Sequence, residues 1–225
     1  MEILSIGQAI FDLFFPRRCL NCESVISFEN PLCISCASNL PFTHWQLNRN
    51  NQAYDKLKDF CRVESAHSLL LFQHDNVTQK LLHNLKYLNH PEIGVLLAEK
   101  LLQEFDLKTF DGIIPVPIHP KKLKKRGYNQ VVPYAQTIAE KSGIPFLEDF
   151  MIRVENNPSQ TSKNRNNRLT NIKTAFGLSN QNLQGHFILV DDVLTTGATL
   201  STCVNLIHEK FPDLKISVMT IACAQ

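Results

Sequence analysis

The stretch ILVDDVLTTGATL, residues 188–200, decides the expected fold. It begins as a continuous apolar run, which is typical of a strand buried on both faces of a parallel sheet, and it continues through a loop into a helical pattern. The first backbone N–H groups of such a helix have no partner within it, and the helix dipole adds partial positive charge. The loop is therefore a candidate phosphate cradle, formed by Thr195, Thr196, Gly197, Ala198 and Thr199.

Two acidic residues, Asp191 and Asp192, stand at the edge of this cradle, although carboxylates repel phosphate. They should therefore meet another part of the same ligand. Carboxylates accept hydrogen bonds from sugar hydroxyls and engage Mg²⁺ directly or through water, so a sugar phosphate with a vicinal diol would satisfy both halves. The alternative is an ordinary strand-to-helix turn. A Walker A loop is excluded because the stretch has no lysine, and a GxGxxG motif is absent from the sequence.

The chain around this stretch alternates strands with helices, which is typical of a parallel, doubly wound α/β sheet with helices on both faces. Ligands bind beyond the carboxyl ends of the strands in such sheets, and the PVP loop at 115–117 lies at one such end. Besides the opening stretch, strands are expected at 68–73, 110–115, 146–154, 174–179 and 215–224, and helices at 77–88, 93–105, 131–141 and from the cradle to about 210.

Four of the seven cysteines form two CxxC pairs, CLNC and CISC, which are ten residues apart. Two such turns can present four thiolates to one tetrahedral Zn²⁺, and a site with four protein ligands is structural rather than catalytic. Disulfides and a redox CxxC are the alternatives. The N-terminus lacks an export signal, so we expect a cytoplasmic location, where thiols stay reduced. The expected zinc ligands are Cys19, Cys22, Cys33 and Cys36.

The charged residues give a net charge of only +2, so the composition does not indicate a basic nucleic-acid-binding protein. Basic side chains nevertheless cluster twice. They could be solvated, could meet a highly charged ligand or could follow a nucleic-acid backbone. The first cluster is Lys121, Lys122, Lys124, Lys125 and Arg126, and the second is Lys163, Arg165, Arg168 and Lys173.

Three segments are expected along the chain. Residues 1–45 would be an N-terminal helix with the four-cysteine zinc module, 46–109 a linker with a helical hood, and 110–225 the α/β domain. The apolar N-terminus is interpreted as a docking helix that ends before Pro16. Peripheral membrane association through this helix is the weaker alternative, and no apolar run reaches transmembrane length.

Several segments together resemble the ComF family of competence-associated proteins (ComFC/GntX-like). These are FPRRCLNC with CISC, IIPVPIHPKKLKKRGYNQ, the Arg-rich RNNRLTNIKTAF, and DDVLTTGAT. They occur in the family's order and cover nearly the whole chain. DDVLTTGAT alone is similar to the phosphoribosyl pyrophosphate (PRPP) signature of type I phosphoribosyltransferases.

The resemblance implies a type I phosphoribosyltransferase-like sheet that binds PRPP or ribose 5-phosphate with Mg²⁺. Asp191 and Asp192 would hold the ribose hydroxyls, 195–199 the 5′-phosphate, and Val116 and Pro117 would belong to the pyrophosphate loop. Residues 158–170 would take the place of a flexible loop that closes over PRPP. The basic residues, namely Lys121, Lys122, Lys124, Lys125, Arg126, Arg165 and Arg168, would contact pyrophosphate or DNA.

By the same resemblance, the protein would handle single-stranded DNA in the cytoplasm during natural transformation. A competence helicase of the ComFA type is an expected partner on this ground alone. Tyr128 is a candidate base-stacking residue, although a lone tyrosine more often packs. A metabolic phosphoribosyltransferase acting on a small nitrogenous acceptor and a non-catalytic PRPP sensor remain open. The residues offer no obvious nucleophile, and glycosyl transfer from PRPP requires none, so turnover is undecided.

Overall fold

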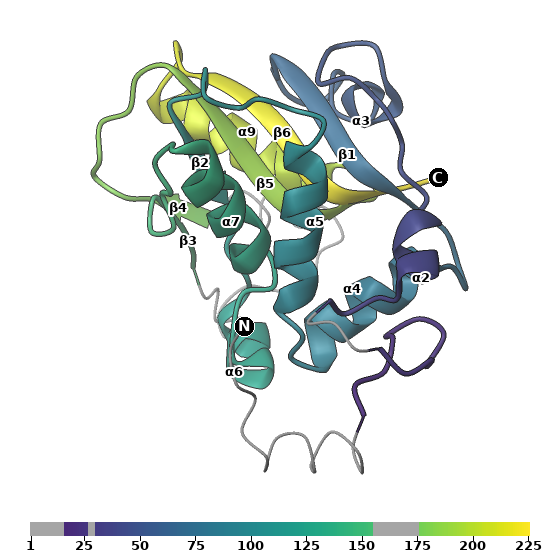
Figure 1. The fold of residues 1–225 in the computed structure, drawn as a ribbon. Helices are drawn as coiled ribbons and strands as arrows, with labels where there is room; N and C mark the ends of the chain where they lie inside the picture. Colours follow the sequence, from purple (N-terminus) through teal and green to yellow (C-terminus); the bar gives the residue numbers. More distant parts are fainter. Residues whose placement is uncertain (1–15, 27–29, 155–175) are drawn as a thin grey trace, which may run out of the picture.

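The centre of the molecule is a four-stranded parallel sheet (Figure 1). The computed structural model describes residues 16–26, 30–154 and 176–225. Each neighbouring pair of strands in the sheet runs parallel, so the expected parallel α/β sheet is confirmed. The strands in spatial order are β1 (Ser65–Phe72), β6 (Lys215–Ala224), β5 (His186–Leu194) and β2 (Gly112–Pro115).

Residues 187–190 of strand β5, FILV, are apolar without interruption because both faces of the strand are covered there. Ile188 and Val190 belong to one core cluster, whereas Phe187 and Leu189 belong to the cluster on the other face. Successive side chains of a strand point to opposite faces, so the sequence FILV supplies both cores in turn.

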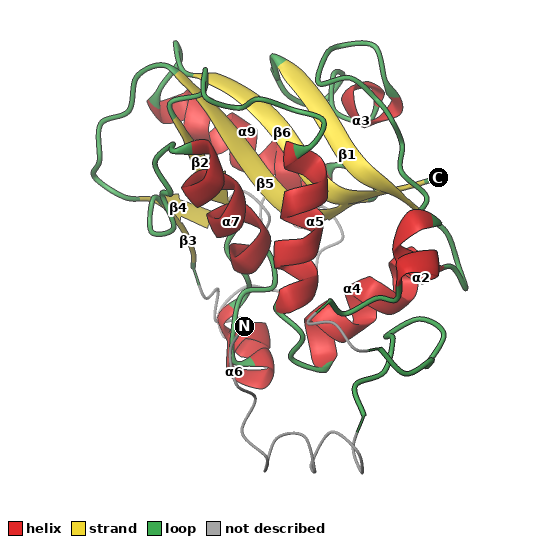
Figure 2. Cartoon of the chain, viewed as in Figure 1, coloured by secondary structure: helices red, strands yellow, loops and turns green. Residues whose placement is uncertain are grey.

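Helices cover both faces of the sheet, as the sequence predicts. In Figure 2, α5 and α7 lie in front of the sheet and α9 lies behind it. The front core also takes the leucine stripe of α4 (Leu81, Leu82 and Leu85), and the rear core takes Cys203, Val204 and Ile207 of α9. The helices in front are α4 (Val77–Tyr87), α5 (Glu92–Leu102) and α7 (Val132–Ser142), and those behind are α3 (Gln52–Asp55) and α9 (Ala198–Lys210).

Local capping sets the ends of these helices. Asn76 begins α4, because its side chain accepts a hydrogen bond from the backbone N–H of Gln79. Gly143 ends α7 in the left-handed conformation, with φ of 70°. The expected helices at 131–141 and from the cradle to about 210 are therefore confirmed within a residue or two.

The prediction of one strand over 146–154 is wrong. Phe146 forms only an isolated bridge with Ile113 beside β2, and the chain then turns at two exposed acidic residues, Glu148 and Asp149. Only β3 (Met151–Arg153) is a strand, and it pairs antiparallel with β4 (Phe176–Leu178) in a separate two-stranded sheet.

The cysteine-rich segment packs on the front layer of helices. It contains the short helix α2 (Ile34–Ser38), and Cys19, Leu32 and Leu40 join the same core cluster as α4 and α5. Lys80 of α4 donates a hydrogen bond from Nζ to the carbonyl oxygen of Asn21, at 3.1 Å. The expected N-terminal helix lies outside the described residues.

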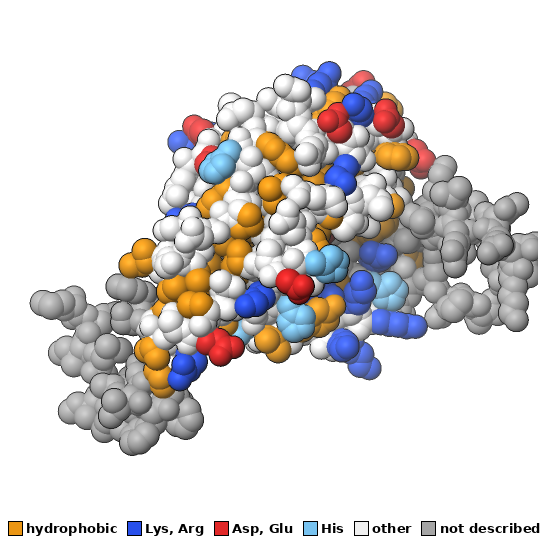
Figure 3. All heavy atoms as spheres, turned by 90° about the vertical axis from the view of Figure 1, so that its right-hand side faces the viewer, with side chains coloured by type: hydrophobic (Ala, Val, Ile, Leu, Met, Phe, Trp, Pro, Cys, Tyr) orange, Lys and Arg blue, Asp and Glu red, His pale blue; other side chains and the backbone are white. Residues whose placement is uncertain are grey.

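Helix α6 (Pro120–Arg126) follows β2 and carries the first basic cluster. Figure 3 shows one face of the molecule, where Lys, Arg and His side chains gather at the lower right, at the height of α4 and α6 in Figure 1. Across the described part of the chain, no helix is long and apolar enough to span a membrane.

Candidate ligand-binding site

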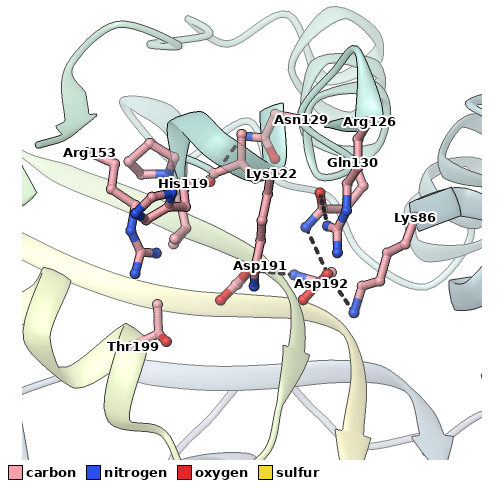
Figure 4. Close-up of a pocket in the computed structure, with 13 residues that line it drawn as sticks. Lys86, His119, Lys122, Arg126, Asn129, Gln130, Arg153, Asp191, Asp192 and Thr199 are labelled. Atoms are coloured by element: carbon pink, nitrogen blue, oxygen red, sulfur yellow. Dashed lines mark hydrogen bonds and ion pairs between the residues drawn. The ribbon is translucent and has the colours of Figure 1, made fainter. Parts of the chain in front are cut away.

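The carboxyl ends of β2 and β5 bring the two predicted loops together. Pro115 lies opposite Val190, and the backbone N–H of Val116 donates to the carbonyl oxygen of Val190 at 2.8 Å. A cavity of about 160 Å³ opens at this edge, as expected for an open α/β sheet (Figure 4). Of the predicted residues it is lined by Val116, Pro117, Lys122, Arg126, Asp191, Asp192 and Thr199.

The remaining cradle residues form a second, smaller hollow of about 40 Å³ next to the first. Both hollows are lined by Asp191 and Thr199, so Asp191 lies between them. The cradle begins α9. Its N-cap, Gly197, has no side chain, and Oγ1 of Thr196 accepts from the backbone N–H of Ala198 at a long 3.4 Å. The N-terminal N–H groups and the helix dipole therefore favour an anion there. The predicted residues that line only this hollow are Thr195, Thr196, Gly197 and Ala198.

Glycine is required at position 197 for two reasons. Its φ of 80° is left-handed, which side chains with a Cβ rarely adopt. A Cβ on Gly197 would also lie 2.9 Å from the carbonyl oxygen of Lys56 and 3.0 Å from Cδ2 of Leu57. The segment that follows α3 thus packs against the cradle at Gly197.

The two adjacent aspartates diverge, because successive residues of a strand face opposite ways. Asp192 is buried, and its Oδ2 accepts from Lys86 Nζ and from Gln130 Nε2, each at 2.9 Å (Figure 4). Asp191 is partly buried and lies on the side of Lys122 and Thr199. Burial, together with the charge of Asp192, raises the pKa of Asp191 to about 8.

Helix α6 divides the first basic cluster into two groups. Lys122 and Arg126 are one turn apart and both line the cavity, whereas Lys121, Lys124 and Lys125 are exposed and do not. Arg126 donates from Nη1 to Oε1 of Gln130 at 2.8 Å. Through Gln130, Arg126 is connected to the carboxylate of Asp192.

The four cysteines of the two CxxC pairs meet as the sequence predicts. Their sulfur atoms all lie within 4.8 Å of one another, and Sγ of Cys22 is 3.7 Å from Sγ of Cys33. A tetrahedral zinc ion with Zn–S bonds of about 2.3 Å would hold its ligand sulfurs roughly 3.8 Å apart, so the cluster could hold a metal such as zinc. Within residues 16–26, 30–154 and 176–225, no other such group of His, Cys, Asp and Glu occurs.

Comparison with known proteins identifies the family. No family model matches the chain. Competence protein F of Haemophilus influenzae is 30% identical over 220 residues, which cover 87% of this chain and 93% of that protein. The chain belongs to the ComF family. Competence protein ComFC of Streptococcus pneumoniae is 30% identical over 52% of each chain, and DNA utilization protein YhgH of Escherichia coli K12 is 26% identical over 84% of this chain and 83% of its own.

Solved structures similar to this ComF protein include two phosphoribosyltransferases. An orotate phosphoribosyltransferase from Aeropyrum pernix has a TM-score of 0.38 and 14% identity, covering 69% of this chain and 80% of its own. An adenine phosphoribosyltransferase from Leishmania tarentolae has a TM-score of 0.36 and 13% identity, covering 79% and 89%. These scores are too low to transfer a substrate or a site residue. The fold class is therefore assigned from the strand order and from the helices on both faces of the sheet.

Sequence reasoning missed several residues that line the cavity of this ComF protein. Lys86 and Arg153 come from α4 and β3, and nothing in their local sequence points to a site. His119 and the amides of Asn129 and Gln130 had a signal, because they stand beside helix starts in the quoted HPKKLKKRGYNQ segment. Asn129 Nδ2 donates to the carbonyl oxygen of Val116 at 3.0 Å and so ties the start of α7 to the β2 loop.

Tyr128 packs rather than presenting its ring for stacking. It is partly buried, and its hydroxyl donates to the backbone carbonyl of Leu85 on α4. Burial raises the pKa of its phenol, so it remains a donor. The second basic cluster (Lys163, Arg165, Arg168 and Lys173) and the expected closing loop at 158–170 lie outside the described residues.

Proposed function

We propose that this ComF protein binds PRPP or ribose 5-phosphate together with Mg²⁺, and that it takes part in natural transformation by handling single-stranded DNA in the cytoplasm. A competence role is supported by its relatives, which are named competence protein F and competence protein ComFC. A helicase of the ComFA type is the proposed protein partner.

The observation that carries the ligand proposal is the position of Asp191 between two hollows of different chemistry. On one side lies the N-terminus of α9, where the N-cap Gly197 offers no side chain, and this suits one phosphate group. On the other side lies a cavity lined by basic side chains, which suits a more highly charged anion. A ligand with a phosphate at one end, hydroxyl donors in the middle and a pyrophosphate at the other end matches this order.

The basic side chains that line the cavity favour the pyrophosphate end of the ligand. Lys86 is already engaged with Asp192, whereas Lys122 reaches toward Asp191 at the mouth and the guanidinium of Arg153 extends toward Thr199 (Figure 4). Nε of Arg153 is buried and has no hydrogen-bond partner among the described residues. The carboxylates of Asp191 and Asp192 are oxygen ligands of the type that Mg²⁺ prefers, and the ion would neutralise part of the pyrophosphate charge.

Isothermal titration with PRPP and with ribose 5-phosphate, each with Mg²⁺, tests the ligand. Lys122→Met should weaken PRPP by about tenfold, because a hydrogen bond to a charged group contributes roughly 1.5 kcal/mol, and it should hardly affect ribose 5-phosphate. Asp191→Asn should weaken both ligands. Asp213→Asn is the matched control, since Asp213 is exposed beside the amino end of β6, at the opposite edge of the sheet.

Binding of neither sugar phosphate by the wild-type protein would sink the ligand proposal. Release of pyrophosphate from PRPP when a small nitrogenous acceptor is added would favour the metabolic phosphoribosyltransferase instead. Binding without turnover would leave the protein a PRPP-responsive component of DNA uptake.

The exposed lysines of α6 carry the DNA half of the proposal. Lys121, Lys124 and Lys125 do not line the cavity, so they are free to meet phosphates of a strand that runs outside it. Each phosphate contact with single-stranded DNA contributes about 0.7 to the slope of log affinity against log salt. Replacing all three lysines with serine should therefore lower the slope by about 2 and leave PRPP binding intact. An unchanged slope would contradict this face as the DNA contact.

A further inference from the structure

An exposed aromatic ring lies beside the cavity, at the C-terminal end of α4. Tyr87 is 53% exposed, although the leucine stripe of the same helix is buried. The guanidinium of Arg126 lies over its ring, 4.9 Å from the centroid, and Arg126 Nη2 donates to its hydroxyl at 3.3 Å. The ring of His83, one turn earlier, is tilted by 45° with its centroid 5.1 Å away, so it does not stack flat on Tyr87.

Two consecutive residues of α4 take different roles. Lys86 directs its ammonium into the cavity and onto Asp192, whereas Tyr87 does not line the cavity. A helix turns by about 100° per residue, so Tyr87 is presented to solvent outside the space expected for a sugar phosphate. Core packing does not explain an exposed ring that is held by an arginine.

The surroundings of this ring are basic. Arg126 is the last residue of α6, and Lys121, Lys124 and Lys125 of the same short helix are exposed. Sites for single-stranded nucleic acid combine cations that follow the backbone with aromatic side chains on which bases stack, and arginine adds a cation–π contribution. A small nucleobase acceptor would need the ring but not the additional lysines.

We propose that Tyr87, with Arg126 over its ring, is a stacking platform for one base of a single-stranded nucleic acid, whose phosphates follow the exposed lysines of α6. The ring takes any base, because every base has a π-face, so the site would be tolerant of sequence. A duplex would not use it, since its bases are already stacked on one another. The platform rests on the proposed contact of this ComF protein with single-stranded DNA and names the residues of that contact.

Fluorescence anisotropy with a labelled oligothymidylate, and with an abasic strand of the same length, tests the platform. Tyr87→Ala and Tyr87→Leu should each weaken oligothymidylate by about 5- to 20-fold, because stacking on an aromatic side chain contributes at least about 1 kcal/mol per base. Tyr87→Phe should bind like the wild type. The wild type should prefer oligothymidylate to the abasic strand, and Tyr87→Leu should lose that preference while keeping the same salt slope.

Phe60→Ala is the matched control, because Phe60 is 63% exposed and lies beside α9, where its carbonyl accepts from Asn205 Nδ2. A cooperative thermal unfolding transition at the Tm of the wild type would show that each Tyr87 variant is folded. Equal oligothymidylate affinity of Tyr87→Leu and the wild type would overturn the platform and leave the ligand and DNA proposals standing. No binding of oligonucleotide by the wild type would overturn the DNA proposal and the platform together. Loss in Tyr87→Leu of binding to a free nucleobase, with oligonucleotide binding unchanged, would assign the ring to a small acceptor instead.

Discussion

Replacing Lys86 with methionine removes the ammonium that holds Asp192 and retains most of the side-chain volume. The two charged atoms are 2.9 Å apart, with side-chain exposures of 23% and 12%. At an effective dielectric constant near 20 their attraction is about 5–6 kcal/mol, and the desolvation of both groups offsets much of it. The carboxylate that remains would be buried with Gln130 as a partner but without a cation. We expect Lys86→Met to lower the free energy of unfolding by about 2 kcal/mol and Tm by about 4–8 °C.

A double-mutant cycle with Asp192→Asn isolates this interaction. Urea unfolding of the two single variants and the double variant should give a coupling energy of about 1–3 kcal/mol, and the double variant should be more stable than the sum of the single losses predicts. A coupling energy near zero would refute the ion pair as a support of the site. Lys100→Met is the control, because Lys100 lies on the neighbouring helix α5 and does not line the cavity.

Three further predictions concern the cradle, the acid and the metal. Gly197→Ala should destabilise the protein by about 1–3 kcal/mol in urea unfolding, because it places a Cβ against Lys56 at a left-handed φ, and an unchanged stability would contradict the geometry of the cradle. Because the pKa of Asp191 is raised to about 8, its protonated form stabilises the fold below the unfolded pKa, and this stability is lost as pH rises through 8. The Tm of the wild type should therefore fall relative to that of Asp191→Asn between about pH 4 and pH 8 and level off above pH 8, and parallel Tm profiles of the two proteins would contradict the raised pKa. Cys33→Ser should lower both Tm and bound zinc, and freshly purified wild-type protein without zinc would rule out the metal.

The cradle and the central strand were predictable because contiguous residues encode them. The run FILV has to be buried on both faces, and Gly197 has to supply a left-handed turn at the start of α9, so no distant partner is needed to recognise either feature. Each CxxC pair is likewise a short contiguous pattern, so the four expected metal ligands could be recognised without knowledge of the fold.

The rest of the site depends on tertiary placement. The five cations of 121–126 look alike in sequence, and only the position of α6 over the cavity separates Lys122 and Arg126 from the others. Lys86 and Arg153 reach the cavity from elements far along the chain, and neither residue carries a local mark. The prediction of one strand over 146–154 was wrong because it relied on the apolar residues and overlooked the turn at Glu148 and Asp149.

Arg126 makes contacts both outside and inside the cavity. It covers the ring of Tyr87 on the outside, and through Gln130 it reaches Asp192 on the inside. A sugar phosphate that moves this guanidinium changes the surface offered to a nucleobase, and thermodynamic linkage makes the effect reciprocal. For a protein that binds both as proposed, the factor by which PRPP alters the affinity for single-stranded DNA equals the factor by which DNA alters the affinity for PRPP. Through Arg126, the concentration of PRPP would thus set the affinity of the protein for incoming DNA. Bound DNA would in turn change the affinity for PRPP.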